Sequence, residues 1–162
     1  MRPAAAAPAA SLTALLVAGG IGVCNAAQYD EGAALFSANC AICHGPAGAG
    51  TPGLAPPLLA NPARYAGMAE GRRQLALTVL YGMFGDILVE QKHYNFKMPE
   101  FSQLDDAKLA AVLNYVAFDL AHAPADTRPL EAAEVAAERN KELDGSAVRE
   151  HRGQVLEALG GG

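Results

Sequence analysis

The chain has 162 residues and a formal net charge of -5, with no tryptophan and only 6% aromatic residues. The length fits one modest domain with extensions, and the shortage of large side chains makes a dense core difficult to build from the polypeptide alone. The net negative charge argues against a nucleic-acid partner, and the acidic residues are spread along the chain and not gathered in one run.

Residues 1–26 have the pattern of a secretory signal peptide. Arg2 supplies the positive charge, residues 11–23 are apolar, and small residues precede a cleavage site after Ala26, with Ala27 nearly as suitable. The apolar run is short and interrupted by glycine, whereas a membrane span needs about 20 apolar residues. The pattern predicts export to the periplasm with no membrane span left after cleavage. The alternative is an uncleaved anchor that faces the periplasm.

Residues 30–43 are predicted to form a helix. Asp30 and Glu31 place negative charge where a helix start favours it. The apolar side chains recur about every 3.6 residues: Leu35, Phe36, Cys40 and Cys43. Gly32 lies inside this helix and costs about 1 kcal/mol relative to alanine. A close contact with another helix would explain this glycine, and the alternative is a harmless glycine near a frayed helix end.

The segment Cys40-Ala41-Ile42-Cys43-His44 has the spacing of a c-type haem attachment site. Two thiols can bond the two vinyl groups of a haem, and the imidazole of His44 then binds the iron. The alternatives are a redox pair of cysteines or half of a zinc site. A zinc site would need a second pair of cysteines, but the only other cysteine, Cys24, lies in the leader. A thioredoxin-like redox pair would need a βαβ pattern, which is absent from the sequence. Cys24 also leaves open the possibility that the protein is a lipoprotein. The motif therefore predicts one covalent haem c.

The middle of the chain alternates between loops and one helix. Residues 45–62 are rich in glycine and proline and are predicted to be an extended loop, with an irregular turn at 64–67. Residues 70–81 are predicted to form a helix. Its apolar side carries Leu75, Val79 and Leu80. Residues 87–89 are either a short strand or part of the wall of a haem crevice.

Met98 is the candidate for the second axial ligand of the iron. A thioether favours the ferrous state, so His/Met ligation raises the reduction potential. Pro99 restricts the backbone of Met98, and the loop context and distance from His44 favour ligation over a role as core filler. His93 is the rival ligand and would give a bis-histidine iron. His122 and His151 lie beyond the core helices and are weaker candidates.

Residues 104–120 form the clearest predicted helix. Asp105 suits the N-cap, and Leu104 with Leu109 fits a hydrophobic staple. Its apolar stripe consists of Leu109, Val112, Leu113, Val116 and Leu120.

Residues 124–162 form a C-terminal extension of different character. A weak repeat at an offset of 13 matches Leu130, Val135 and Arg139 with Leu143, Val148 and Arg152. Each copy is predicted to be a short amphipathic helix, the second with Asp144 as its N-cap. Helices this short are not stable alone in water. The extension therefore packs on the rest of the chain or on a partner, or is largely disordered.

Residues 28–123 resemble a class I cytochrome c of the bacterial monohaem type. The matching residues, in chain order, are Gly32, Phe36, Cys40, Cys43, His44, Pro56-Pro57-Leu58, Tyr94-Asn95, Met98-Pro99 and Tyr115. The resemblance implies an all-α cytochrome c fold whose first and last helices cross over a covalent haem. The chain would then divide into a signal peptide (1–26), a cytochrome c domain (27–123) and the extension (124–162).

The resemblance also implies particular contacts. Gly32 and Phe36 would meet the last helix near Tyr115, and the carbonyl of Pro56 would accept a hydrogen bond from His44, which fixes the imidazole ring. Many members of the family carry glycine before and after the Tyr-Asn pair, whereas this chain has Gln91 and Phe96 there. That departure affects the loop that leads to Met98.

Together these features predict a secreted electron carrier rather than an enzyme. The stretch 78–101 is similar to cytochromes that serve periplasmic dehydrogenases and respiratory enzymes, so the expected partner is a dehydrogenase, an oxidase or a membrane cytochrome complex. A haem enzyme or gas-binding protein with a labile sixth ligand is the alternative function. A further possibility is an obligate subunit whose extension docks on a larger complex.

Overall fold

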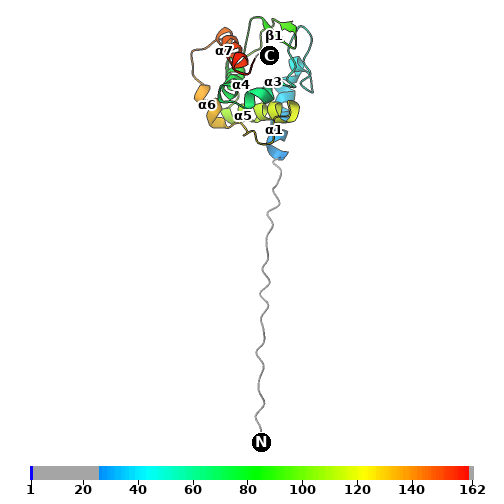
Figure 1. Ribbon diagram of the computed structural model, residues 1–162, viewed down its shortest axis with the longest axis vertical. Coiled ribbons are helices and arrows are strands. Elements are labelled where there is room, and N and C mark those ends of the chain that lie inside the picture. The colour runs from blue at the N-terminus through cyan, green and yellow to red at the C-terminus, as the bar shows by residue number, and fades with distance from the viewer. Residues whose placement is uncertain (2–25, 161–162) are drawn as a thin grey trace.

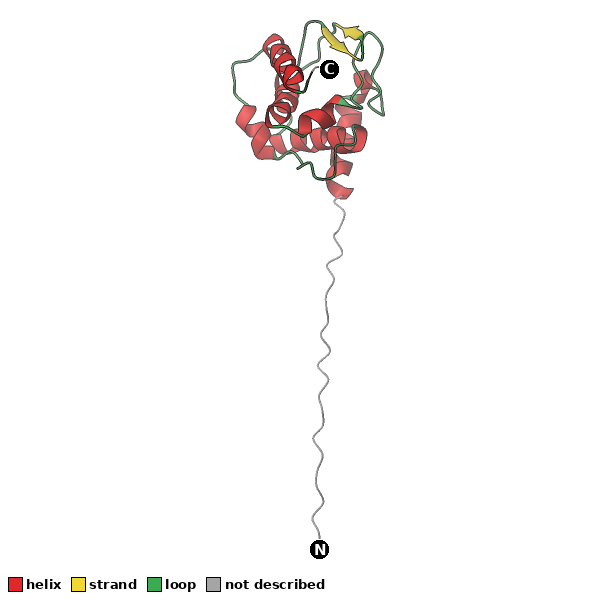
Figure 2. Cartoon of the chain, in the orientation of Figure 1, coloured by secondary structure: helices red, strands yellow, loops and turns green. Residues whose placement is uncertain are grey.

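The computed structural model describes Met1 and residues 26–160, so nearly all of the predicted leader lies outside the described residues. The elements, in chain order, are α1 (Ala26–Asn39), α2 (Ala41–His44), α3 (Asn61–Ala66), α4 (Ala69–Tyr81), β1 (Ile87–Val89), β2 (Lys92–Tyr94), α5 (Asp106–Asn114), the π-helix η1 (Tyr115–Leu120), α6 (Ala132–Glu138) and α7 (Gly145–Ala158). Figures 1 and 2 show a helical body with one small hairpin, which confirms the predicted all-α class. None of the helices in the described part is long and apolar enough to cross a membrane.

The first and last helices of the predicted domain pack tightly at Gly32. A Cβ atom on this residue would overlap the carbonyl oxygen of Ala111 in α5 and lie 2.7 Å from the Cβ of Tyr115. The ring of Phe36 lies 5.5 Å from that of Tyr115, centroid to centroid. The expected reason for the helical glycine is thereby confirmed, because no larger residue fits between the two backbones.

Besides the starts of α1 and α4, at Ala26 and Ala69 instead of residues 30 and 70, three boundaries differ from the sequence predictions. The helix expected over 30–43 is interrupted at Cys40, where the side-chain amide of Asn39 donates to the carbonyl of Leu35 and closes the last turn of α1. The helix expected over 104–120 begins at Asp106, and its predicted N-cap, Asp105, is confirmed because its carboxylate accepts from Lys108 N. The same helix ends in η1, whose wider turn is closed by the hydrogen bond from Ala121 N to Val116 O.

The third difference is α3, which replaces the predicted end of the loop and the irregular turn at 64–67. Pro62 lies in its first turn, where proline is tolerated because the backbone N–H has no partner within the helix. The proline therefore belongs to a helix start rather than to a loop.

The C-terminal extension packs on the domain as two helices. Figure 1 shows α6 and α7 beside α4. The extension buries the apolar side chains of Leu130, which precedes α6, and of Val135, Val148 and Val155. The buried amide of Asn114 donates to Leu130 O at 3.0 Å and accepts from Leu130 N at 2.7 Å, which holds the start of the extension. The predicted N-cap Asp144 is confirmed, because its carboxylate accepts from two backbone N–H groups.

Arg72 of α4 forms the strongest polar link to the extension. Its guanidinium donates to the two carboxylate oxygens of Glu134 at 2.7 and 2.6 Å. It also donates to the backbone carbonyls of Arg128 and Pro129. Arg72 is only 8% exposed, and a buried charge of this kind requires a paired anion. This bidentate ion pair therefore fixes α6 against α4.

We expect this ion pair to make the stability of the protein depend on pH. The guanidinium of Arg72 lowers the pKa of Glu134 from 4.5 to about 2. The carboxylate therefore favours the folded state above pH 4.5, and this contribution is lost as the pH falls towards 2. One pKa unit corresponds to about 1.4 kcal/mol, so the loss is up to about 3 kcal/mol.

Denaturant titrations of wild type and Glu134→Gln at about pH 6 and about pH 3 measure this effect. The variant should be less stable at the higher pH, and the difference should shrink at the lower pH. Glu150→Gln, which removes an exposed carboxylate of α7, serves as the control and should show no such dependence. An equal difference between wild type and Glu134→Gln at both pH values would contradict the role of this pair.

Candidate functional site

A pocket lies among the helices and the hairpin. Its volume is about 250 Å³. One water molecule needs about 10–15 Å³, so the pocket is suited to a large group rather than to a single ion. The wall is mainly apolar. Among its apolar lining residues are Phe36, Leu75, Val79, Tyr94, Leu113 and Val116.

All five residues that the sequence marked as haem-binding line this pocket: Cys40, Cys43, His44, Pro56 and Met98. The two cysteines are partly buried, and Ile42, which lies between them in the sequence and also lines the pocket, is 85% exposed. The hydroxyl of Thr51 donates to Cys43 O at 2.7 Å, which holds the loop against the motif. Residues from distant parts of the chain thus converge on one cavity.

His44 is buried, and its orientation is set by one hydrogen bond. Its Nδ1 lies 2.9 Å from the carbonyl oxygen of Pro56, which can only accept, so Nδ1 carries the proton. Burial lowers the pKa of His44, and the bond to Pro56 opposes this effect. The ring is therefore neutral near pH 7, with its Nε2 lone pair available to a metal.

The environment of the cysteines does not suit a redox pair or a zinc site. Burial, together with the neighbouring Cys43, raises the pKa of Cys40 to about 11. Catalytic disulfide pairs instead depend on a thiol pKa that is lowered. Across residues 26–160 there is no group of three or more His, Cys, Asp or Glu side chains that could hold a metal ion. Thioether formation, which uses up both thiols, is compatible with this site.

Met98 is placed in the pocket by a pair of backbone hydrogen bonds to Met83. Met98 N donates to Met83 O at 2.8 Å, and Met83 N donates to Met98 O at 3.1 Å. Residues paired in this way on antiparallel segments direct their side chains to the same side, and Met83 also lines the pocket. Sequence reasoning passed over Met83 because no proline follows it. The pocket thus contains two thioethers.

The three rival histidines lie outside the pocket lining. His93 is exposed on β2, where its Nδ1 lies 2.8 Å from Asp86 Oδ2. His122 is also exposed, and His151 bonds the polar side chains of α4. The geometry gives none of them access to a group in the cavity.

The hairpin explains how the chain reaches Met98 without the usual glycines. Strands β1 and β2 pair in antiparallel register, with Leu88 opposite His93. The two residues of the turn, Glu90 and Gln91, have φ values of 49° and 62°, a conformation that two-residue hairpin turns require and that glycine or asparagine usually supplies. The turn therefore forms at some conformational cost, and Phe96 remains 63% exposed at the pocket wall.

Several further polar residues line the pocket, and two of them, Tyr65 and Arg152, were missed from the sequence although they are buried. Tyr65 of α3 is buried, and Arg152 comes from α7 in the C-terminal extension. Neither belongs to a motif, and Arg152 stands out in the sequence only as a member of the weak repeat. No local pattern could have placed either residue beside the haem-binding motif.

Comparisons with known proteins agree with this geometry. A family model described as Cytochrome c matches residues 29–117. A cytochrome c-552 from Thermus thermophilus is 41% identical over 107 residues, which cover 66% of this chain and 69% of that protein. A second cytochrome c-552 from Thermus thermophilus is 44% identical over 87 residues, which cover 54% and 66%.

Proposed function

Because the chain belongs to the cytochrome c family, which binds covalent haem c and transfers electrons, we propose that His44 and Met98 are the two axial ligands of its haem iron. One observation carries the proposal. The imidazole and the thioether come from segments far apart in the sequence and line the same apolar pocket. The cysteines that would form the thioether bonds lie in the same lining.

The residues of the pocket have separate tasks in this proposal. When bound, haem c supplies an iron that alternates between the ferric and ferrous states. Pro56 holds the ring of His44 in the neutral form that ligates a metal. Met98 fills the position at which a substrate or gas would otherwise bind, and its soft sulfur favours the ferrous state. The apolar wall keeps water away from the metal.

Electrons would enter and leave at the edge of the pocket beside Cys40 and Cys43. Ile42, between the two cysteines in the sequence, is 85% exposed, and Phe96, another residue of the pocket lining, is 63% exposed. Side chains of this kind offer a small apolar contact, which suits a brief encounter with another redox protein. We propose a periplasmic or membrane-bound oxidoreductase as the partner, because the leader pattern indicates export.

The axial ligand is tested with a matched pair of variants, Met98→Ala and Met83→Ala. Ferric haem ligated by methionine has a weak long-wavelength absorption band, and we expect this band in the wild type. Met98→Ala should abolish the band and lower the midpoint potential, since the thioether favours the ferrous state. Met83→Ala removes the neighbouring thioether and should leave the band in place.

Two results would contradict the proposal. Loss of the band in Met83→Ala, with its retention in Met98→Ala, would transfer the ligand role to Met83. A wild-type protein without the band and with a high-spin ferric spectrum would favour the haem enzyme or gas-binding alternative.

A further inference from the structure

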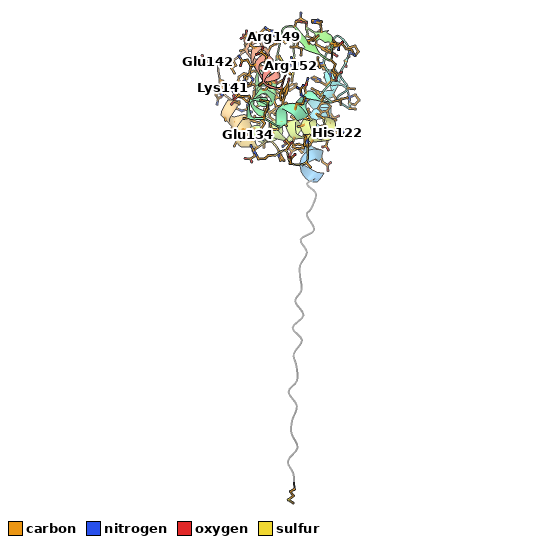
Figure 3. All side chains as sticks on the ribbon, viewed as in Figure 1. His122, Glu134, Lys141, Glu142, Arg149 and Arg152 are labelled. Atoms are coloured by element: carbon orange, nitrogen blue, oxygen red, sulfur yellow. The ribbon has the colours of Figure 1, made fainter. Side chains whose placement is uncertain are left out.

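Arg152 is a buried positive charge at the wall of the pocket. It belongs to α7, is 8% exposed and lines the cavity together with residues of the domain. Its Nη2 donates to the carbonyl oxygen of Leu88 at 3.3 Å. No carboxylate within residues 26–160 forms an ion pair with it. Figure 3 labels Arg152 and its neighbour Arg149 on α7.

Arg72 provides a comparison within the same protein. Both arginines are 8% exposed, but Arg72 donates to both oxygens of Glu134 and to several backbone carbonyls. A buried guanidinium without an anion bears a desolvation penalty that one carbonyl does not offset. Arg152 therefore lacks the anionic partner that Arg72 has, and the pocket is the place from which such a partner can come.

Tyr65 supplies a second, independent indication. This residue is 6% exposed, and its hydroxyl, buried in the pocket lining, lies close to the guanidinium of Arg152 but makes no hydrogen bond of good geometry with any described residue. Burial raises the pKa of Tyr65, and the positive charge of Arg152 is the largest opposing influence. The two groups are thus neighbours, and together they offer a guanidinium and a hydroxyl to one anion.

We propose that Arg152 and Tyr65 bind a propionate carboxylate of the haem. A haem carries its two propionates on the half of the macrocycle away from the vinyl groups that bond the cysteines. A carboxylate matches the planar guanidinium in geometry and charge, and it also accepts from a hydroxyl. The C-terminal extension thereby contributes directly to cofactor binding. This assignment rests on the covalent haem and is independent of which residue provides the sixth ligand.

The charge of Arg152 should influence the redox equilibrium. A nearby cation disfavours the ferric state, which carries one more positive charge than the ferrous state. Arg152→Gln should therefore shift the ratio of ferrous to ferric protein about tenfold towards ferric at a fixed potential. A tenfold change corresponds to about 59 mV in the midpoint potential of a one-electron couple.

Redox titration of the haem-loaded variants tests the proposal. Arg152→Gln should lower the midpoint potential, Arg152→Lys should recover most of it because the charge is kept, and Tyr65→Phe should lower it slightly. Arg139→Gln is the matched control. It removes another arginine of the extension, which bonds Asp106 and the backbone carbonyls of Ser102 and Leu104 outside the pocket lining. It should reduce stability and leave the potential unchanged.

An unchanged potential in Arg152→Gln would overturn the assignment, as would an equal fall in Arg139→Gln. If Arg152→Gln cannot be obtained with haem bound, Arg152→Lys and Tyr65→Phe test the assignment instead. Two results together would contradict charge pairing: Tyr65→Phe has the midpoint potential of the wild type, and Arg152→Lys loses as much haem as Arg152→Gln. The methionine band is recorded in each sample. Its absence from the wild type would count against Met98 as ligand without affecting the comparison at Arg152.

Discussion

Gly32→Ala should destabilise the protein by about 3 kcal/mol, although alanine is the better helix former. The added methyl group would overlap the carbonyl oxygen of Ala111 and press on Tyr115. Both obstacles belong to the backbone or the base of a side chain, so α1 and α5 must separate. The separation would also disturb Phe36, which packs at this crossing and lines the pocket.

Chemical denaturation measures this effect, with Gly153→Ala as the matched control. Gly153 lies inside α7, and a methyl group added there would meet nothing within 4 Å. The same change at this position should therefore stabilise the protein by about 0.5–1 kcal/mol. Opposite signs for the two variants are expected. Similar stabilities for both would mean that the crossing of α1 and α5 can relax without loss.

Removal of residues 124–162 should also lower the stability of the folded protein strongly. The deletion would expose the core surface against which Leu130, Val135, Val148 and Val155 pack. It would also leave Arg72 without Glu134. Burial of each such side chain contributes about 1.5–3 kcal/mol before entropic costs, whereas a whole domain is stable by only about 5–15 kcal/mol.

Thermal unfolding followed by circular dichroism tests this expectation. For a net loss of about 5 kcal/mol, the unfolding temperature should fall by about 10–20 °C. Removal of residues 160–162 alone is the control and should change little, because a Cβ at Gly160 would meet nothing within 4 Å. A truncated protein that unfolds at the wild-type temperature would show that the extension is dispensable for the fold.

This role of the extension changes how docking on a larger complex has to be tested. A deletion that unfolds the domain cannot separate an obligate subunit from a free carrier. Charge reversal of Glu150 and Glu157, which are exposed on α7, alters the outer surface of the extension and spares its buried face. Unchanged reduction by a partner in these variants would argue against a docking role for α7.

The parts of the site that were predictable from the sequence are those whose chemistry is local. Cys40, Cys43 and His44 lie close together in one short segment, so their spacing alone specifies a reaction with haem. The proline after Met98 marked one methionine among several. Gly32 was recognisable because a glycine inside a helix needs a reason. In each case, a neighbouring residue carried the information.

The features that escaped prediction depend on contacts between distant segments. The backbone pairing of Met83 with Met98 brings a second thioether to the cavity, and no sequence pattern around Met83 predicts this pairing. Arg152 reaches the pocket only because α7 packs on α4. The break at Cys40 and the start of α3 near Pro62 are choices between similar local conformations, which tertiary packing decides.

The position of Arg152 near the end of the chain has a consequence for biogenesis. The cysteines of the attachment motif leave the ribosome long before α7 exists, so the wall of the pocket is incomplete during most of synthesis. The hydrogen bond between Arg64 and Leu159 spans 95 residues, and contacts of such long range form late because they close large loops. The haem can thus be attached while the pocket is still incomplete, and α7 then completes the pocket wall.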